Sequence, residues 1–181
     1  MLREAPQMDP YRIAEDTWII PELFTAGPDA LISVNSMVVA GAEPVIVDTG
    51  GARNRERWLQ QAWSIVDPVD VRWIFISHDD HDHVGNLLPA LDACPQATLV
   101  ANWWIIERLR TEYDLPLGRC RWVNAGESFD AGDRIFRTVL PPVFDSPATR
   151  GLFDTLTGVL WASDCFASLV THPVKIGRAH V

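Results

Sequence analysis

The chain has 181 residues, 48% of them hydrophobic and 22% charged, and its formal net charge is -9 at pH 7. This length and balance fit one folded domain and exclude a largely disordered chain. An acidic chain without a run of basic residues is a poor match for nucleic acid or an anionic membrane, because phosphate binding depends on clustered Lys and Arg. We therefore expect a small molecule or another protein as the partner.

The sequence contains no recognisable targeting or membrane segment. Its N-terminal region mixes charges with prolines, and no stretch approaches the ~18 uninterrupted apolar residues of a membrane span. We expect a cytoplasmic protein. Cys94, Cys120 and Cys165 are odd in number and form no C-x-x-C pair, so we expect reduced thiols rather than disulfides or a thiolate zinc site.

The apolar pattern changes period repeatedly along the first two thirds of the chain. The elements that it predicts are strands at 17–24, 31–40 and 44–47, a helix at 53–66, a strand at 72–76, a helix at 85–93, a strand at 97–101 and a helix at 103–113. This alternation predicts βαβ units and a sheet covered by helices. The remaining part is richer in strands and turns, including a strand at 159–162, and no linker divides the chain. We predict one mixed α/β domain over residues 1–175.

The last six residues of the chain are expected to differ in origin from the rest. Ile176 to Val181 resemble the translation of a common sequencing adapter, so we exclude them, His180 included, as a non-native tail. On this interpretation the natural protein continues past Lys175 and the chain is a fragment. An unusual but genuine tail is the alternative.

The stretch "SHDDHDHVGN", Ser77 to Asn86, holds three of the five histidines and three aspartates within six consecutive positions. It directly follows the predicted strand at 72–76. Asp48 and Asp164 likewise follow predicted strands. Because the carboxyl ends of strands in α/β sheets line one crevice, we expect these groups to converge there.

Crowded carboxylates repel one another, whereas a divalent cation neutralises them and accepts neutral imidazoles as ligands. The loop offers a mixed nitrogen and oxygen ligand set for two adjacent metals, from His78, Asp80, Asp82 and His83. The alternative is a solvated acidic turn in which Asp82 caps the next helix.

The segments "VDTG", "SHDDHDHVGN" and "GVLWASD" together resemble the metallo-β-lactamase superfamily, whose usual motif is H-x-H-x-D-H. The resemblance extends from about Thr17 to Val174. It implies an αββα sandwich of two mixed sheets flanked by helices, with a binuclear metal site at the sheet edges. The C-terminal part of that fold is expected to be missing here.

A narrower resemblance follows from Asp80, a carboxylate at the second motif position, since the flavodiiron proteins and their flavin-free relatives have H-x-E-x-D-H. An oxygen ligand in place of a histidine favours iron over zinc. By this resemblance His78 and Asp80 bind one metal. Asp82 and His83 then bind the other, and Asp164 bridges the two.

Two departures from the family pattern are visible. No histidine lies between His83 and His172, so Asp145 is the nearest substitute for the missing middle ligand, with Ser146 or water as alternatives. Asp145 also suits an ordinary turn, and Asp164 an ordinary strand end. The last histidine ligand of the family lies beyond this chain, and His172 is not expected to replace it.

Two further groups are expected near the site without binding metal. His81 occupies an unassigned motif position and is expected to point away. Asp48, which with Thr49 forms part of the turn "VDTGG", is expected to orient a ligand histidine.

Three functions fit these features. The first is a di-iron protein that binds or reduces O2 or NO; no flavin-binding segment is recognisable, so electrons come from a lost domain or a separate flavoprotein, and the resemblance suggests a homodimer. The second is a zinc hydrolase of an ester, thioester, amide or phosphoester, in which Asp82 orients the metal-bridging hydroxide or accepts a proton from the water that forms it. The third is a non-catalytic metal sensor or a degenerate relative.

Overall fold

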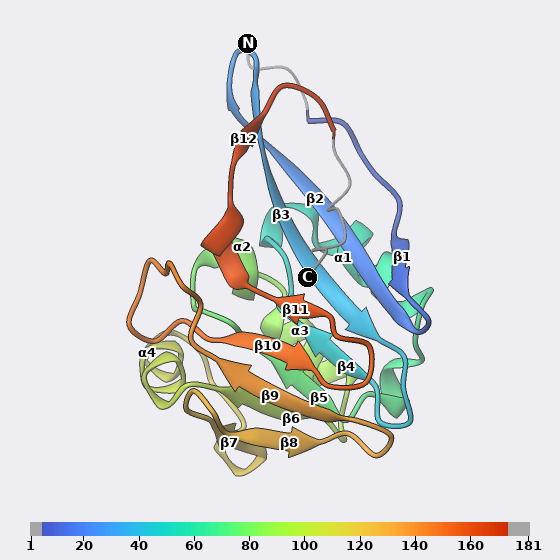
Figure 1. The fold of residues 1–181 in the computed structure, drawn as a ribbon, viewed down its shortest axis with the longest axis vertical. Coiled ribbons are helices and arrows are strands. Elements are labelled where there is room, and N and C mark those ends of the chain that lie inside the picture. The colour runs from blue at the N-terminus through green and yellow to red at the C-terminus, as the bar shows by residue number, and fades with distance from the viewer. Residues whose placement is uncertain (1–4, 174–181) are drawn as a thin grey trace.

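The computed structural model describes residues 5–173, in which the strands form two sheets (Figure 1). The first sheet contains, in spatial order, β1 (Tyr11–Ala14), β2 (Thr17–Gly27), β3 (Ala30–Val39), β4 (Val45–Val47), β5 (Trp73–Phe75), β6 (Thr98–Ala101) and β7 (Cys120–Trp122), with β12 (Leu169–Val170) paired to β3. The second contains β11 (Leu160–Trp161), β10 (Gly151–Asp154), β9 (Ile135–Val139) and β8 (Ser128–Asp130).

Strands β4 to β7 run parallel, and helices connect them. The connecting helices are α1 (Arg55–Trp63) before β5, α2 (His81–Val84) and α3 (Leu87–Ala93) before β6, and α4 (Trp103–Glu112) before β7. Short 3-10 helices lie at Ala52–Asn54, Pro68–Asp70, Leu117–Arg119 and Ser163–Phe166. The predicted βαβ units are thereby confirmed.

Two apolar cores separate the layers. One lies between the helices and the outer face of the first sheet, and includes Trp58 and Ala62 from α1. The other lies between the sheets, where Phe75 of β5 belongs to the same core as Phe136 of β9. Figure 1 shows the second sheet lying across β4 to β7, with α1 and α3 on the far side. The helix layer and both sheets of the expected sandwich are therefore present.

The second half of the chain forms strands because its side chains alternate between two environments. In β9, Phe136 and Thr138 are buried against the first sheet, whereas Ile135 and Arg137 are exposed. This alternation is typical of an antiparallel sheet with one covered face.

The surroundings of Asp164 and Asp82 differ from the expectations, and the suspected tail cannot be compared. The strand before Asp164 is only Leu160–Trp161, and Asp164 lies in the 3-10 helix that follows it. Asp82 does not cap a helix: α2 begins after Asp80, which makes no capping hydrogen bond with its side chain, and Asp82 lies in the first turn. The suspected tail at 176–181 lies outside the described residues.

Two further features are the character of the helices and the state of the cysteines. Over residues 5–173, no helix combines the length and the apolar character that crossing a bilayer requires. The three cysteines are free thiols, Cys94 being buried and Cys120 and Cys165 partly buried.

Candidate metal centre

The candidate ligands meet where β4 and β5 end. These strands are parallel neighbours, and the backbone N–H of Asp48 donates to the carbonyl of Phe75 at 2.9 Å. Asp48 has a φ of +56°, an uncommon conformation for a residue other than glycine. This conformation accompanies a carboxylate that is fully buried beside the histidine loop.

His83 lies between two carboxylates. Its Nδ1 is 3.1 Å from Asp48 Oδ2, and its Nε2 is 3.2 Å from Asp164 Oδ1. Burial lowers the pKa of His83, but the contacts with Asp164 and Asp48 outweigh burial and raise the pKa to about 10. The contact with His83 lowers the pKa of Asp164, although partial burial opposes this. A positive charge at His83 is therefore strongly favoured, whether from a proton or from a cation.

His78 faces three carboxylates. Its Nε2 lies 3.7 Å from Asp80 Oδ2, 3.8 Å from Asp145 Oδ2 and 3.7 Å from Asp164 Oδ2. The His78 and His83 rings are adjacent, with centroids 4.0 Å apart. The two imidazoles and their carboxylates thus form one continuous cluster.

The cluster has the donor atoms that a metal requires. The Nε2 atoms of both His78 and His83 are buried, and within residues 5–173 neither makes a hydrogen bond of good geometry, although His83 Nε2 lies at ion-pair distance from Asp164. Buried polar atoms are rarely left unpaired, and a place for a bound ion is one of the recognised reasons. Potential ligand atoms within 4.8 Å of one another form two groups, His78 with His83 and Asp164, and His78 with Asp80 and Asp145. The residues therefore fit metal binding.

Asp164 connects the two histidines through different oxygens. Oδ1 faces His83 and Oδ2 faces His78. Asp164 therefore lies between the two imidazoles, and its role as a bridging ligand stays a prediction. Asp164 remains partly exposed, its side chain retaining 43% of its accessible surface, so the cluster is open to solvent on this side.

Asp145 also lies in the cluster, although it belongs to the loop between β9 and β10 and does not directly follow a strand. Its Oδ1 accepts a hydrogen bond from Thr149 Oγ1 at 2.8 Å, while Oδ2 faces His78. Thr149 holds the carboxylate in this orientation, so the turn interpretation and the ligand interpretation are compatible.

The structure does not bring every predicted group together. The carboxylate of Asp82 belongs to neither ligand group; it lies near Glu22, whose pKa is raised by burial and then by Asp82. His81 and His172 are exposed and also belong to neither group. Asp82 as a ligand and as a catalytic group therefore stays a prediction.

Three residues of the site were not predicted. Ser77, Trp161 and Ser163 surround Asp48 and His78 with hydrogen bonds. Ser77 and Ser163 each directly precede a candidate ligand in the sequence, which is the only signal that pointed to them. Trp161 donates from Nε1 to Asp48 Oδ2 at 3.0 Å.

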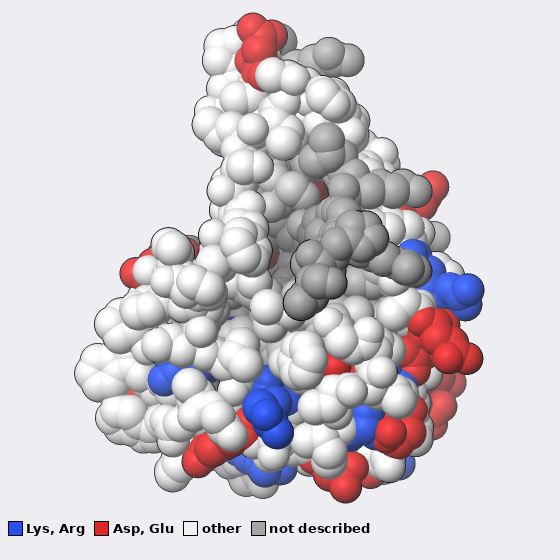
Figure 2. Space-filling view, in the orientation of Figure 1, with Lys and Arg blue, Asp and Glu red and all other residues white. Residues whose placement is uncertain are grey.

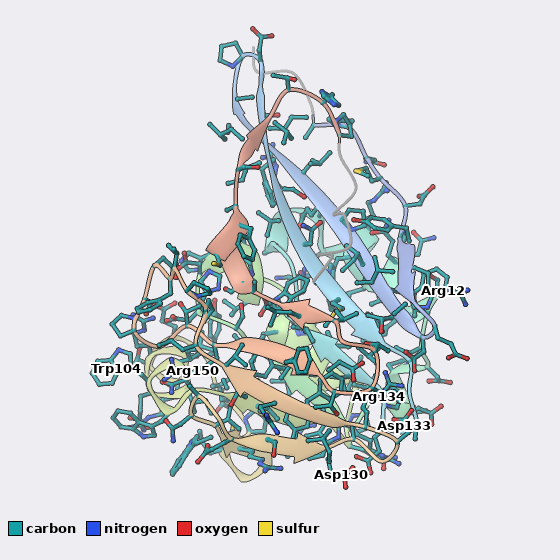
Figure 3. All side chains as sticks on the ribbon, viewed as in Figure 1. Arg12, Trp104, Asp130, Asp133, Arg134 and Arg150 are labelled. Atoms are coloured by element: carbon teal, nitrogen blue, oxygen red, sulfur yellow. The ribbon has the colours of Figure 1, made fainter. Side chains whose placement is uncertain are left out.

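The surroundings of the cluster combine charged and apolar side chains. Arg150 (Figure 3) donates its backbone N–H to the Ser77 carbonyl at 2.9 Å, which ties the Asp145 loop to the histidine loop. Phe166 and Leu169, close to Asp164 in the chain, are exposed. Figure 2 shows a largely uncharged surface over β12.

Comparisons with known proteins agree with this fold. The profile described as ODP family beta lactamase matches residues 32–178. Among relatives, the diflavin flavoprotein A 1 of Thermosynechococcus vestitus is 30% identical over 135 residues, covering 74% of this chain and 24% of that protein. The anaerobic nitric oxide reductase flavorubredoxin of Salmonella typhi is 24% identical over 135 residues, covering 74% of this chain and 28% of that protein.

Solved structures show the same fold. A variant of the flavo di-iron protein from Thermotoga maritima matches with a TM-score of 0.76 and 20% identity, covering 87% of this chain and 42% of that one. Rubredoxin oxygen:oxidoreductase from Desulfovibrio gigas matches with a TM-score of 0.71 and 17% identity, covering 81% and 38%.

The chain belongs to the ODP family of β-lactamase-fold proteins, within the flavodiiron branch of the metallo-β-lactamase superfamily. It spans about a quarter of the length of the curated relatives that it matches.

Proposed function

We propose that residues 1–175 supply the metal-binding domain of a longer di-iron oxidoreductase that reduces O2 or NO. The observation that carries this proposal is the position of Asp164, whose two oxygens face two buried imidazole nitrogens without hydrogen-bond partners. The names of the relatives, a nitric oxide reductase and an oxygen:oxidoreductase, support the choice of a diatomic gas.

The donor set favours iron over zinc. Besides the two histidines, the ligand groups contain only carboxylates, from Asp80, Asp145 and Asp164. Oxygen-rich sets suit harder metals better than thiolate or all-imidazole sets do. Asp145 in place of the family's histidine adds one negative charge, so it favours the more highly charged state of a redox metal.

The residues of this chain bind and orient the metals. When bound, the iron supplies the electrons and the coordination positions that reduction of a diatomic gas requires. His78 and Asp80 hold one metal together with Asp145; His83 holds the other, and Asp82 is proposed as its additional ligand. Asp48 keeps Nδ1 of His83 engaged at 3.1 Å, which leaves Nε2 free for coordination.

Electrons reach this site from outside the metal-binding domain. We propose a flavin-containing segment of the longer protein or a separate flavoprotein as the donor, and a homodimer as the assembly.

The test compares two reactions on the full chain after reconstitution. With Fe(II) added anaerobically and dithionite as reductant, we expect consumption of NO or O2 above that of a His83→Ala control. With Zn(II), we expect no hydrolysis of a chromogenic ester or β-lactam above the same control.

Hydrolysis by the zinc form without gas consumption by the iron form would replace this proposal with a hydrolase. Metal binding with neither reaction would favour a metal sensor.

A further inference from the structure

Two serine hydroxyls connect His78 to the buried carboxylate of Asp48. Ser163 Oγ lies 3.0 Å from His78 Nδ1 and 3.0 Å from Ser77 Oγ. Ser77 Oγ lies in turn 2.7 Å from Asp48 Oδ2. The four groups form a continuous relay, of which Asp48, Ser77 and His78 are buried. Ser77 Oγ also lies 3.1 Å from His78 Nδ1 directly.

The direction of the relay follows from its carboxylate end. Asp48 Oδ1 faces the backbone N–H of Ser77 at 2.7 Å, and Oδ2 faces Trp161 Nε1 at 3.0 Å. Both of these groups can only donate, so Asp48 is an acceptor. The Ser77 hydroxyl gives its single hydrogen to Asp48. Its oxygen is then left to accept a hydrogen bond.

The next two hydrogen bonds follow in order. Ser163 donates its hydroxyl hydrogen to Ser77, and Nδ1–H of His78 is shared between Ser163 Oγ at 3.0 Å and Ser77 Oγ at 3.1 Å. The opposite arrangement, with Ser163 donating to His78, leaves the two serine oxygens 3.0 Å apart with no hydrogen between them. A contact of this kind between unprotonated lone pairs in a low-dielectric interior is unfavourable.

We propose that Ser77 and Ser163 together are positioning residues that fix His78 as its Nδ1–H tautomer and so present the Nε2 lone pair to the metal. The proposal rests on the metal-binding function proposed above and deepens it. Asp48 sets the tautomer of His83 by direct contact and that of His78 through Ser77 and Ser163. One buried carboxylate thus prepares both histidines as Nε2 ligands.

The backbone supports a specific role for Ser163. Ser163 and Asp48 are the only non-glycine residues with a positive φ among residues 5–173, at +53° and +56°. Such conformations have an energetic cost and persist where the surrounding structure requires them. Here both residues belong to the relay, Ser163 as one of the serines and Asp48 as its carboxylate end.

The experiment uses two variants at position 163. Ser163→Gly removes the hydroxyl and accepts the positive φ without strain. Ser163→Asn also accommodates this conformation, and its side-chain oxygen replaces the lost acceptor. The tautomer is read from the imidazole 15N shifts of His78 in the metal-free protein, with the ring neutral. Zn2+ affinity is measured in parallel.

We expect the Nδ1–H tautomer in the wild type and in Ser163→Asn. Ser77→Ala is expected to give a mixture of tautomers and about 10- to 100-fold weaker Zn2+ binding, the usual effect of losing a partner of a ligand histidine, because Ser163 then loses its acceptor and can donate to His78 instead. Ser163→Gly leaves Ser77 Oγ as an acceptor for Nδ1–H and is expected to shift the tautomer less. It provides the test if Ser77→Ala does not fold.

An Nε2–H tautomer in the wild type, or an unchanged tautomer in both Ser163→Gly and Ser77→Ala, would overturn the relay. A wild type with the Nδ1–H tautomer that binds no Zn2+ would instead overturn the metal site and leave the relay standing. The two proposals can therefore fail separately.

Discussion

Two charged clusters lie toward opposite ends of β10, and only one of them is complete in the sense that every buried nitrogen has a hydrogen-bond partner. At the end of β10, Arg134 binds three carboxylates, those of Asp16, Asp133 and Asp154, and every nitrogen of its guanidinium has a partner. Near the start of β10, the carboxylates around His78 and His83 face nitrogens that have none. Figure 3 shows Arg134 beside Asp133, with Arg150 at the other end of the second sheet.

The comparison separates a structural ion cluster from a binding site. Arg134 connects the β1–β2 turn of the first sheet to β10 of the second, so its charges are satisfied within the fold. The imidazoles of the histidine cluster are as buried as Arg134, but its ligand carboxylates are 42–64% exposed, and it needs a cation from outside. Charge alone does not distinguish the two clusters; hydrogen-bond satisfaction does.

The largest expected effect is loss of stability when the complete cluster is broken. Arg134→Ala leaves buried carboxylates without a counterion and is expected to cost about 3–5 kcal/mol in the free energy of unfolding. Urea denaturation measures this cost. Zn2+ affinity is expected to stay unchanged, and a large loss of affinity would contradict the separation of the two clusters.

The incomplete cluster predicts a pH dependence in the metal-free protein. The folded-state pKa of His83 is raised from 6.5 to about 10. The contribution of protonated His83 to the free energy of unfolding is therefore fully present below pH 6.5 and is lost as the pH rises toward 10. We expect the free energy of unfolding to fall by a few kcal/mol across this window, at ~1.4 kcal/mol per unit of pKa shift. His83→Gln is expected to flatten the profile.

Asp164 tests the bridging position. Asp164→Asn retains the shape of the side chain and removes the charge shared by both histidines, so we expect at least about 100-fold weaker Zn2+ binding, beyond the usual cost of losing a partner of a ligand. Isothermal titration measures the affinity. A change below tenfold would show that Asp164 does not bind the metal.

Asp145 is expected to have a smaller effect, because its group keeps His78 and Asp80. Asp145→Ala is expected to weaken Zn2+ binding about tenfold, within the range seen for such partners, and Asp145→His to restore it. Asp79→Asn is the matched control. Asp79 lies in the histidine loop between His78 and Asp80, is ion-paired with Arg108 and belongs to neither ligand group. Equal losses from Asp79→Asn and Asp145→Ala would mean that general charge, not coordination, controls affinity.

The sequence predicted much of the fold because hydrophobic period reports burial directly. The strand and helix alternation from 44 to 113 appears in the structure as β4 to β6 with the helices between and after them. Crowding of His78, Asp80 and His83 also pointed to the site. Which members of the motif converge was harder to predict: Asp82 shares the motif but belongs to neither ligand group, because α2 begins within the motif.

The partners of the ligands were beyond sequence reasoning for a different reason. Ser77 and Ser163 are separated by 86 positions, and they meet only because β5 and β11 end at the same place. No local pattern encodes such a contact. Asp145 was recognised only by the absence of the expected histidine, and its orientation by Thr149 required the structure.

The most direct test of the central claim is the iron content of the full chain after anaerobic Fe(II) loading and gel filtration, with His83→Ala beside the wild type. The proposed ligand sets, His78 with Asp80 and Asp145 and His83 with Asp82, predict two iron atoms per wild-type chain and a clear loss in the variant with unchanged helix content by circular dichroism. Retention of no iron by the wild type, or of equal iron by both proteins, would contradict the assignment of this cluster as a metal centre.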